Sequence, residues 1–149
     1  IENDEQVVKE IHRVLKPGGK LILTTPNLLM SLSRNPWHTR EYTPHSMRDI
    51  LEISFSDIEM NGVFGNEKIM QYYNANKKSV ERIRKWDILN LEKNMPRRLL
   101  QVPYDILNRF NRHKLQDKNE SLVNDVKYTD YSISEMTDKC LDYFCIATK

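Results

Sequence analysis

The stretch Leu15-Lys16-Pro17-Gly18-Gly19-Lys20, followed by Leu-Ile-Leu-Thr-Thr-Pro-Asn at 21–27, decides the fold. The proline excludes the lysine before it from helical geometry, and the glycine pair supplies a permissive turn, so a helix ends here. The short apolar run at 20–25 predicts a strand. Its composition is typical of a central strand in a parallel sheet, covered on both faces. Ligands in open α/β sheets bind beyond the carboxyl ends of the strands, so a functional site is expected just after Thr25.

A helix is expected before this turn. Asn3 can act as its N-cap, with Gln6 three residues on as the capping-box partner. The apolar residues of this segment recur at helical spacing and form one face: Val7, Val8, Ile11, Val14 and Leu15.

Three further elements are expected outside the middle of the chain. After a polar and aromatic loop at 26–43, Thr43 and Pro44 are typical of the cap and first position of a helix. Alternating apolar residues near 56–64 predict a strand. The run 141–148 is apolar on both faces, which favours a central or sub-edge strand, with a short helix capped by Ser134 before it.

The middle of the chain, 66–125, has a different character. Residues 77–114 carry eleven Lys/Arg and four Asp/Glu, a net charge of +7, whereas the whole chain is +2. An apolar residue every third position predicts an amphipathic helix through Val80, Ile83, Trp86 and Leu89. A short helix is expected from Pro103, with a loop over 111–127.

Composition limits the class of protein. With 149 residues, 39% apolar and 30% charged, the chain is long enough for one domain with a core and has an ordinary soluble balance. No apolar run approaches the roughly 20 residues of a membrane span.

The start of the chain lacks a Met and the features of a signal peptide, so we expect a fragment or processed product in the cytoplasm. Cys140 and Cys145 are expected to be buried, reduced thiols. The four histidines show no metal-ligand spacing, so no metal site is expected.

The segment EIHRVLKPGGKLILTTPN (10–27) resembles the post-cofactor half of class I S-adenosylmethionine-dependent methyltransferases. The segment NPWHTREYTPHSMRDILEISFSDIEMNGVFG (35–65) is similar to a subgroup with an H-x-R-E-Y-T-P stretch, which includes O-methyltransferases of the ubiquinone-biosynthesis type. The end, LDYFCIATK (141–149), resembles the last, antiparallel strand of the same sheet.

The resemblance implies an α/β fold: the C-terminal half of a Rossmann-like seven-stranded methyltransferase sheet. The whole of 1–149 would be one partial domain, with strands five to seven in 1–65 and 126–149 and a helical insertion or cap at 66–125. The family's glycine-rich cofactor loop lies before this part, and none of the four glycines forms a G-x-G-x-G motif. We therefore expect the isolated chain to be inactive without an N-terminal half.

Candidate site residues cluster around the loop after the first strand. Pro26 and Asn27 either lie at the edge of the S-adenosylmethionine site or form a simple strand-end turn. His38 is a candidate general base for a hydroxyl acceptor, because its ordinary pKa is near neutral. Arg40 is a candidate to hold a carboxylate or phosphate.

Each of these functional interpretations has a structural alternative. Arg40 and Glu41 could form a pair that fastens the loop to the next helix, with Tyr42 packed beneath. Trp37 could cover the substrate pocket or pack in the core. Four arginines of the basic middle segment could form a lid that attracts an anionic acceptor, or a solvated helical face: Arg97, Arg98, Arg109 and Arg112.

The implied function is S-adenosylmethionine-dependent methylation of a small-molecule acceptor, anionic in one interpretation, at oxygen and by direct displacement. Peripheral membrane contact through 77–114 is a further expectation, whereas no nucleic-acid recognition motif is present. Two alternatives stay open. One is a non-catalytic or inactive partial domain that acts as a binding module. The other is a different Rossmann-like enzyme, such as a nicotinamide-dependent dehydrogenase.

Overall fold

The computed structural model describes residues 2–86, 94–118 and 125–149. Contacts divide the chain into two compact units. Unit 1 comprises 1–31, 39–64 and 132–149, and unit 2 comprises 32–38 and 65–131. The loop that carries the H-x-R-E-Y stretch is therefore shared between the two units.

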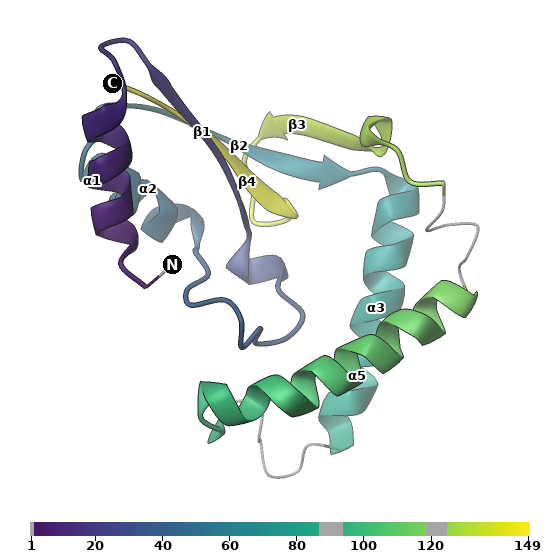
Figure 1. Cartoon of the computed structure of the whole chain (residues 1–149). Helices are drawn as coiled ribbons and strands as arrows, with labels where there is room; N and C mark the ends of the chain where they lie inside the picture. Colours follow the sequence, from purple (N-terminus) through teal and green to yellow (C-terminus); the bar gives the residue numbers. More distant parts are fainter. Residues whose placement is uncertain (1, 87–93, 119–124) are drawn as a thin grey trace. The chain divides into compact units, whose positions relative to one another are not determined.

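Unit 1 is built on a four-stranded sheet (Figure 1). The strands lie in the order β1-β4-β2-β3, with β4 antiparallel to both β1 and β2. Their bounds are β1 Lys20–Pro26, β2 Asp57–Gly65, β3 Tyr131–Glu135 and β4 Asp142–Thr148. The three strands expected from the sequence at 20–25, 56–64 and 141–148 are thus confirmed and share one sheet. The inner position expected for the last of them is confirmed as well.

The expectation that β1 is a central strand covered on both faces is wrong for the described structure. β1 pairs only with β4 among the described strands, and its residues alternate between exposed and half-buried. Ile22, on the outward face, is 61% exposed. The reason is that the helices of unit 1 lie on one face of the sheet, so only every second side chain of β1 meets a core.

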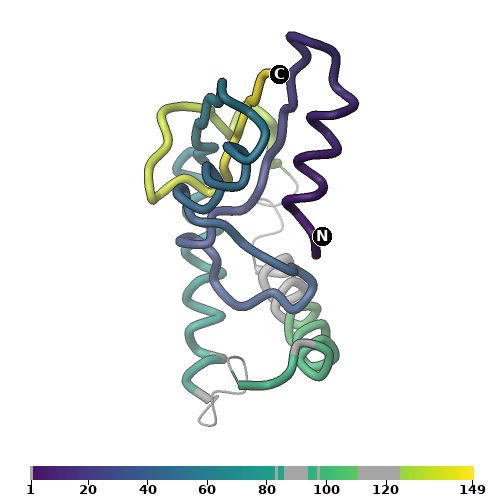
Figure 2. Tube along the Cα trace, turned by 90° about the vertical axis from the view of Figure 1, so that its left-hand side faces the viewer, coloured from purple at the N-terminus to yellow at the C-terminus, as the bar shows by residue number. Residues whose placement is uncertain are grey.

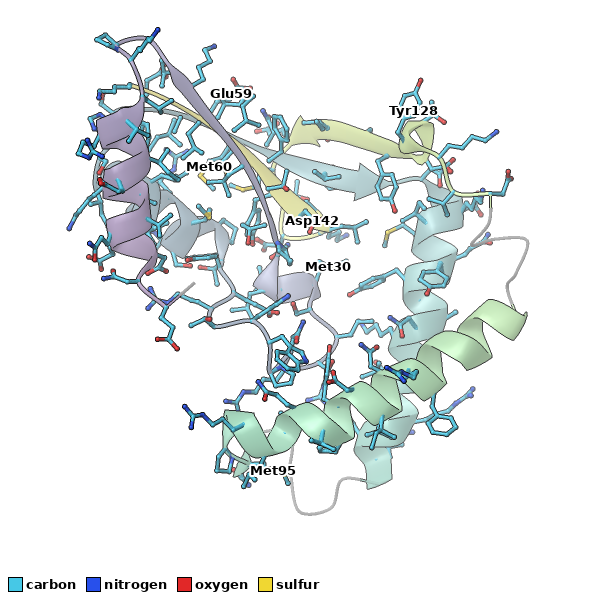
Figure 3. The ribbon with its side chains drawn as sticks, in the orientation of Figure 1. Met30, Glu59, Met60, Met95, Tyr128 and Asp142 are labelled. Atoms are coloured by element: carbon cyan, nitrogen blue, oxygen red, sulfur yellow. The ribbon has the colours of Figure 1, made fainter. Side chains whose placement is uncertain are left out.

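Two helices cover that face, α1 (Asp4–Val14) and α2 (Pro44–Glu52) (Figure 1). Successive residues of a strand point to opposite faces. Met60 of β2 accordingly packs against the core, whereas its neighbour Glu59 is exposed on the other face (Figure 3). The buried core consists of Val8, Met47, Ile50, Leu51, Phe55, Cys140, Tyr143, Cys145 and Ala147.

The caps predicted for α1 and α2 are present. The Asn3 side chain accepts a hydrogen bond from the Gln6 backbone N–H, 3.2 Å from nitrogen to oxygen. The Gln6 side chain bonds to the Asn3 side-chain amide rather than to its backbone, so only half of the expected capping box forms. At α2, Thr43 and Ser46 form a complete box. These local contacts explain why both helix starts could be read from the sequence.

The turn after α1 is tied to the end of β4. Gly18 has a φ of +76°, a conformation that favours glycine. Its N–H donates to the Lys149 carbonyl at 2.8 Å, and the Lys149 N–H donates to Gly19 at 2.9 Å. The Lys149 ammonium also donates to the carbonyl of His12 in the last turn of α1. The tube in Figure 2 shows the two segments side by side.

Unit 2 contains α3 (Glu67–Trp86) and α5 (Arg97–Lys118), which pack against each other. Both helices are longer than expected. α3 begins directly after β2, and its expected continuation to Leu89 lies outside the described residues. α5 begins six residues before Pro103 and continues to Lys118, over part of the expected loop. Pro103 lies inside α5, although a proline in a helix interior lacks one backbone hydrogen bond and crowds the carbonyl four residues before it.

The short helix expected from Ser134 to Cys140 is wrong. Ser134 lies inside β3, an exposed strand that continues the sheet beyond β2. The sequence Tyr-Ser-Ile-Ser-Glu alternates at strand periodicity, and edge pairing with β2 decides its conformation. A short 3-10 turn, η2 (Tyr128–Asp130), precedes β3, and another, η1 (Leu28–Met30), follows β1.

Candidate functional site

Asn27 is fully buried directly after β1, where its amide joins two distant parts of unit 1. Its Nδ2 donates to the backbone carbonyls of Asp138 at 3.1 Å and Cys140 at 2.8 Å. Its Oδ1 accepts from the Leu29 N–H at 2.9 Å and from the Tyr143 hydroxyl. An asparagine amide has two donor hydrogens and two acceptor lone pairs, and all four are used. The amide therefore locks the end of β1 to the turn before β4.

This network favours the strand-end interpretation of Asn27. A cofactor contact through the Asn27 amide would have to replace one of these internal bonds, and its role as a cofactor ligand stays a prediction. Pro26 closes β1 opposite Asp142 of β4 and is exposed. Tyr143 is completely buried, and burial is the main reason why the pKa of its hydroxyl is raised.

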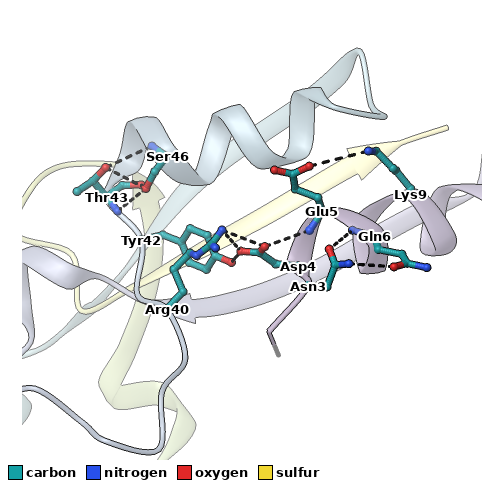
Figure 4. Close-up of polar contacts among 9 residues, drawn as sticks. All are labelled: Asn3, Asp4, Glu5, Gln6, Lys9, Arg40, Tyr42, Thr43 and Ser46. Carbon is teal, nitrogen blue, oxygen red and sulfur yellow. Dashed lines mark hydrogen bonds and ion pairs between the residues drawn. The ribbon is translucent and has the colours of Figure 1, made fainter. Parts of the chain in front are cut away.

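Arg40 and Tyr42 meet at Asp4, the first residue of α1 (Figure 4). The Arg40 Nη1 atom lies 2.7 and 2.9 Å from the two carboxylate oxygens of Asp4. The Tyr42 hydroxyl donates to Asp4 Oδ2. The Leu28 N–H donates to the Tyr42 carbonyl at 3.0 Å, beside Asn27. The loop is therefore fastened to α1 on one side and to the end of β1 on the other.

The charges of this cluster shift the pKa values of its members. Burial opposes ionisation of Asp4, but the Tyr42 hydrogen bond and the positive charge of Arg40 outweigh it, so the pKa of Asp4 lies below its ordinary value. Burial, together with the adjacent Asp4 carboxylate, raises the pKa of Tyr42 to about 12. Asp4 is thus ionised and Tyr42 neutral throughout the physiological range.

Sequence reasoning did not identify Asp4 as part of the site. It noted an acidic start of the chain, but no spacing rule connects residue 4 with residues 40 and 42. The expected structural alternative was an Arg–Glu pair that ties the loop to the next helix. The described ion pair of Arg40 is made with an aspartate of the preceding helix α1. Glu41 is half-buried in the same loop, and its proposed contact with substrate stays a prediction.

Trp37 and His38 belong to unit 2, whereas Arg40, Glu41 and Tyr42 belong to unit 1. The Asn35 side chain accepts from the Trp37 N–H at 3.0 Å and shapes a tight turn. The indole Nε1 of Trp37 donates to Asp105 of α5 at 2.9 Å. Trp37 is 56% exposed and His38 is exposed as well. The interpretation of Trp37 as a core residue is therefore wrong, and a role as pocket cover stays a prediction.

The two arginines predicted to contact substrate begin α5. Arg98 is exposed, and the side chain of Arg97 lies outside the described part of the structure. A polar hollow in unit 2 is lined by Asn66, Glu67, Lys68 and Gln71, and none of these residues was predicted to bind a ligand.

Asp142 is a candidate that sequence reasoning missed. It is the first residue of β4 and is half-buried, in register with Pro26 of β1 and Val63 of β2 (Figure 3). It lies on the face of the sheet opposite to that of buried Tyr143. Burial raises the pKa of its carboxyl. Asp142 lies at the carboxyl ends of β1 and β2 and has a raised pKa, which are the location and chemistry of a site residue. In the sequence, the only signal for Asp142 was its position at the start of a strand.

Cys140 and Cys145 are free and buried, as expected from the sequence. Burial is the main cause that raises the pKa of both thiols, that of Cys145 to about 11. In the part of the chain that the structure describes, no three His, Cys, Asp or Glu side chains form a group that could hold a metal ion.

A stretch of 65 residues is 40% identical to a probable S-adenosylmethionine-dependent methyltransferase of Mycolicibacterium smegmatis. The match covers 40% of this chain and 25% of that protein. No family model matches the chain. No solved structure matches it either. The similarity supports a relationship of this chain to the S-adenosylmethionine-dependent methyltransferases.

Proposed function

We propose that this chain is the acceptor-side part of an S-adenosylmethionine-dependent methyltransferase that methylates a small molecule at oxygen. The similarity to the Mycolicibacterium smegmatis protein carries the proposal. The sheet agrees with it, because the resemblance implies three strands in one sheet with the last strand antiparallel, and β4 lies antiparallel to β1 and β2.

The described residues alone do not suit a nucleoside cofactor. The chain has no glycine-rich loop, and the Asn27 amide at the end of β1 is fully engaged by the protein. We therefore propose S-adenosylmethionine binding only for a protein in which further residues supply that loop. The cofactor would provide an electrophilic methyl group, and the protein would contribute alignment of the acceptor.

Within this proposal, His38 takes the proton of the acceptor hydroxyl. Arg40 holds an anionic group of the acceptor. Arg40 hydrogen-bonds to Asp4 through its Nη1 atom. We assign binding of the anionic group of the acceptor to the other guanidinium nitrogens of Arg40. Trp37, Glu41, Tyr42, Arg97 and Arg98 are each proposed, residue by residue, to contact the acceptor.

A binding module without catalysis is the second candidate function. It is favoured by one specific observation, the lack of a G-x-G-x-G motif among the four glycines. In that case the loop at 35–43 would serve recognition alone.

Calorimetry separates these functions. The test compares the 149-residue chain with the full product of the reading frame that encodes it, titrated with S-adenosylmethionine and with a nicotinamide dinucleotide. We expect micromolar S-adenosylmethionine binding to the full product and none to the 149-residue chain. A full product that binds neither ligand would favour the non-catalytic binding module. A full product that binds only the nicotinamide ligand would indicate a dehydrogenase.

A further inference from the structure

An apolar stripe runs along the outward side of α5. It is formed by Leu99, Val102, Ile106 and Phe110, which are 64%, 66%, 53% and 73% exposed. Their spacing of three, four and four residues places them on one face of the helix. Single exposed apolar residues are normal on a protein surface, but a stripe over three turns is typical of an interaction surface.

The other side of the same helix faces inward. Leu100 is 7% exposed, and Gln101, Tyr104 and Asn108 are half-buried. An ordinary surface helix buries its apolar stripe and exposes its polar side. In α5 the inward side holds two amide side chains, Gln101 and Asn108, whereas the outward side carries the four apolar residues of the stripe. The stripe is therefore not explained by the packing of α5 within unit 2.

Positive charge borders the stripe. Arg98 and Arg109, both exposed, are eleven residues apart and so lie on the same flank of α5. The acidic residue on that flank, Asp105, accepts a hydrogen bond from Trp37. The surrounding sequence 77–114 has a net charge of +7. Apolar side chains next to arginines suit a partner with an apolar interior and an anionic surface.

We propose that the outward face of α5 docks on an anionic lipid bilayer, with the helix parallel to the membrane surface. The stripe would enter the boundary between headgroups and acyl chains, and the arginines would contact lipid phosphates. No helix among the described residues is long and apolar enough to cross a membrane. A second copy of the chain is a poorer occupant, because two segments that each carry a net charge of +7 would repel each other. The proposal does not depend on methyl transfer.

Vesicle sedimentation tests the proposal directly. The 149-residue chain is mixed with phosphatidylcholine vesicles, with or without phosphatidylglycerol. We expect binding to the vesicles that contain phosphatidylglycerol, weakened by salt. The double variant Ile106→Ser/Phe110→Ser keeps every charge and should bind at least tenfold more weakly. Arg98→Gln/Arg109→Gln keeps the stripe and should bind about tenfold more weakly.

Matched controls come from exposed residues of unit 1. Val14→Ser/Ile133→Ser removes two exposed apolar side chains from α1 and β3, and Lys16→Gln/Lys20→Gln removes two exposed charges. Both should bind vesicles as the original chain does, and far-UV circular dichroism should be unchanged in all variants. Equal binding to both kinds of vesicle, or undiminished binding of the Ile106/Phe110 variant, would overturn the proposal. So would a dimer in analytical ultracentrifugation that the same variant abolishes, because the stripe would then hold a second copy.

Discussion

At the scale of single residues, Asn27 hydrogen-bonds to three residues more than one hundred positions away, Asp138, Cys140 and Tyr143. Its replacement by alanine would leave the Tyr143 hydroxyl, one backbone N–H and two backbone carbonyls without their bonds. Because unsatisfied buried polar groups cost about 1–3 kcal/mol each and part of the cost relaxes, we expect Asn27→Ala to lower the free energy of unfolding by about 3 kcal/mol.

Denaturant titration followed by circular dichroism measures this loss. Tyr143→Phe is the matched control, because it removes only one of the four bonds and should cost about 1 kcal/mol. Equal losses in the two variants would contradict the interpretation of Asn27 as the centre of the network.

Tyr42 and Asp4 are coupled through a hydrogen bond, and this coupling depends on pH. The lowered pKa of Asp4 means that the folded state holds the carboxylate more strongly than the unfolded chain does. The resulting stabilisation is present above the ordinary pKa of aspartate, near 3.8, and is lost as the pH falls through the lower folded value. Tyr42→Phe should raise the pKa of Asp4 and weaken the fold by about 1.5 kcal/mol at neutral pH.

Carbon-13 NMR titration of the aspartate carboxyls measures the pKa of Asp4, and urea unfolding measures stability. Tyr128→Phe, at a residue that is 90% exposed, is the control and should change neither quantity. An unchanged Asp4 titration in the Tyr42 variant would show that the hydrogen bond does not form in solution.

These residue contacts mark the limit of sequence reasoning about the site. Arg40 and Tyr42 were identified by their motif, but their shared partner lies 36 and 38 residues earlier in the chain. The turn-forming character of Asn27 could be predicted locally. Its bonds to Asp138, Cys140 and Tyr143 could not, because they depend on the position of β4.

At the scale of elements, Gly62 constrains β2 at a point where the strand approaches the turn before β4. A Cβ atom at Gly62 would lie 2.6 Å from the Cβ of Cys140, which is completely buried, and 2.8 Å from the ring of Phe64. The Cβ of Cys140 is attached directly to the backbone, so a side-chain rotation cannot relieve that contact. We expect Gly62→Ala to lower the free energy of unfolding by about 1–3 kcal/mol through overpacking.

Thermal unfolding of Gly62→Ala measures this effect. The double variant Gly62→Ala/Cys140→Gly removes the clashing Cβ of Cys140 and provides the control. It should be less destabilised than the sum of the two single variants, because the close contact is relieved. Simple additivity would show that the contact does not limit the strand.

The success of sequence reasoning also varied between elements. The start of α2 was predicted because Thr43, Pro44 and Ser46 specify it locally. The start of α5 was not, because Pro103 was interpreted as the first residue of a helix and instead lies inside one. β3 was missed because its five residues are all exposed and carry no core signal. The pairing partner of such a strand decides its conformation.

At the scale of the whole molecule, β4 connects the other strands of the sheet. It is bonded on both sides, to β1 and to β2, whereas β3 lies beyond β2 in the strand order. Proline cannot donate to a ladder and is poorly tolerated in central strands. We expect Ile146→Pro in β4 to abolish cooperative unfolding of unit 1, because it disrupts the strand that joins β1 to β2.

The control is the same substitution in β3, Ile133→Pro, at an isoleucine that is 54% exposed. It should preserve a cooperative transition with a modest loss of stability. Near-UV circular dichroism and the sharpness of the urea transition compare the two variants. Equal disruption by both prolines would contradict the strand order.

Sequence reasoning predicted the inner position of β4 from its apolar run on both faces, but not the uncovered outer face of β1. Strand composition indicates how much burial a segment can use. It does not indicate which other segment supplies that burial. Ile22 in β1 is apolar, and no described helix covers it.

The middle position of β4 also determines when the sheet can form during biosynthesis. The ribosome releases β1 and β2 before the strand that joins them, and the contact between Leu23 and Cys145 spans more than one hundred residues. Until β4 emerges, both earlier strands present bare edges, which invite pairing with other nascent chains. Translation of the intervening helices therefore prolongs the period in which these segments can pair with another chain.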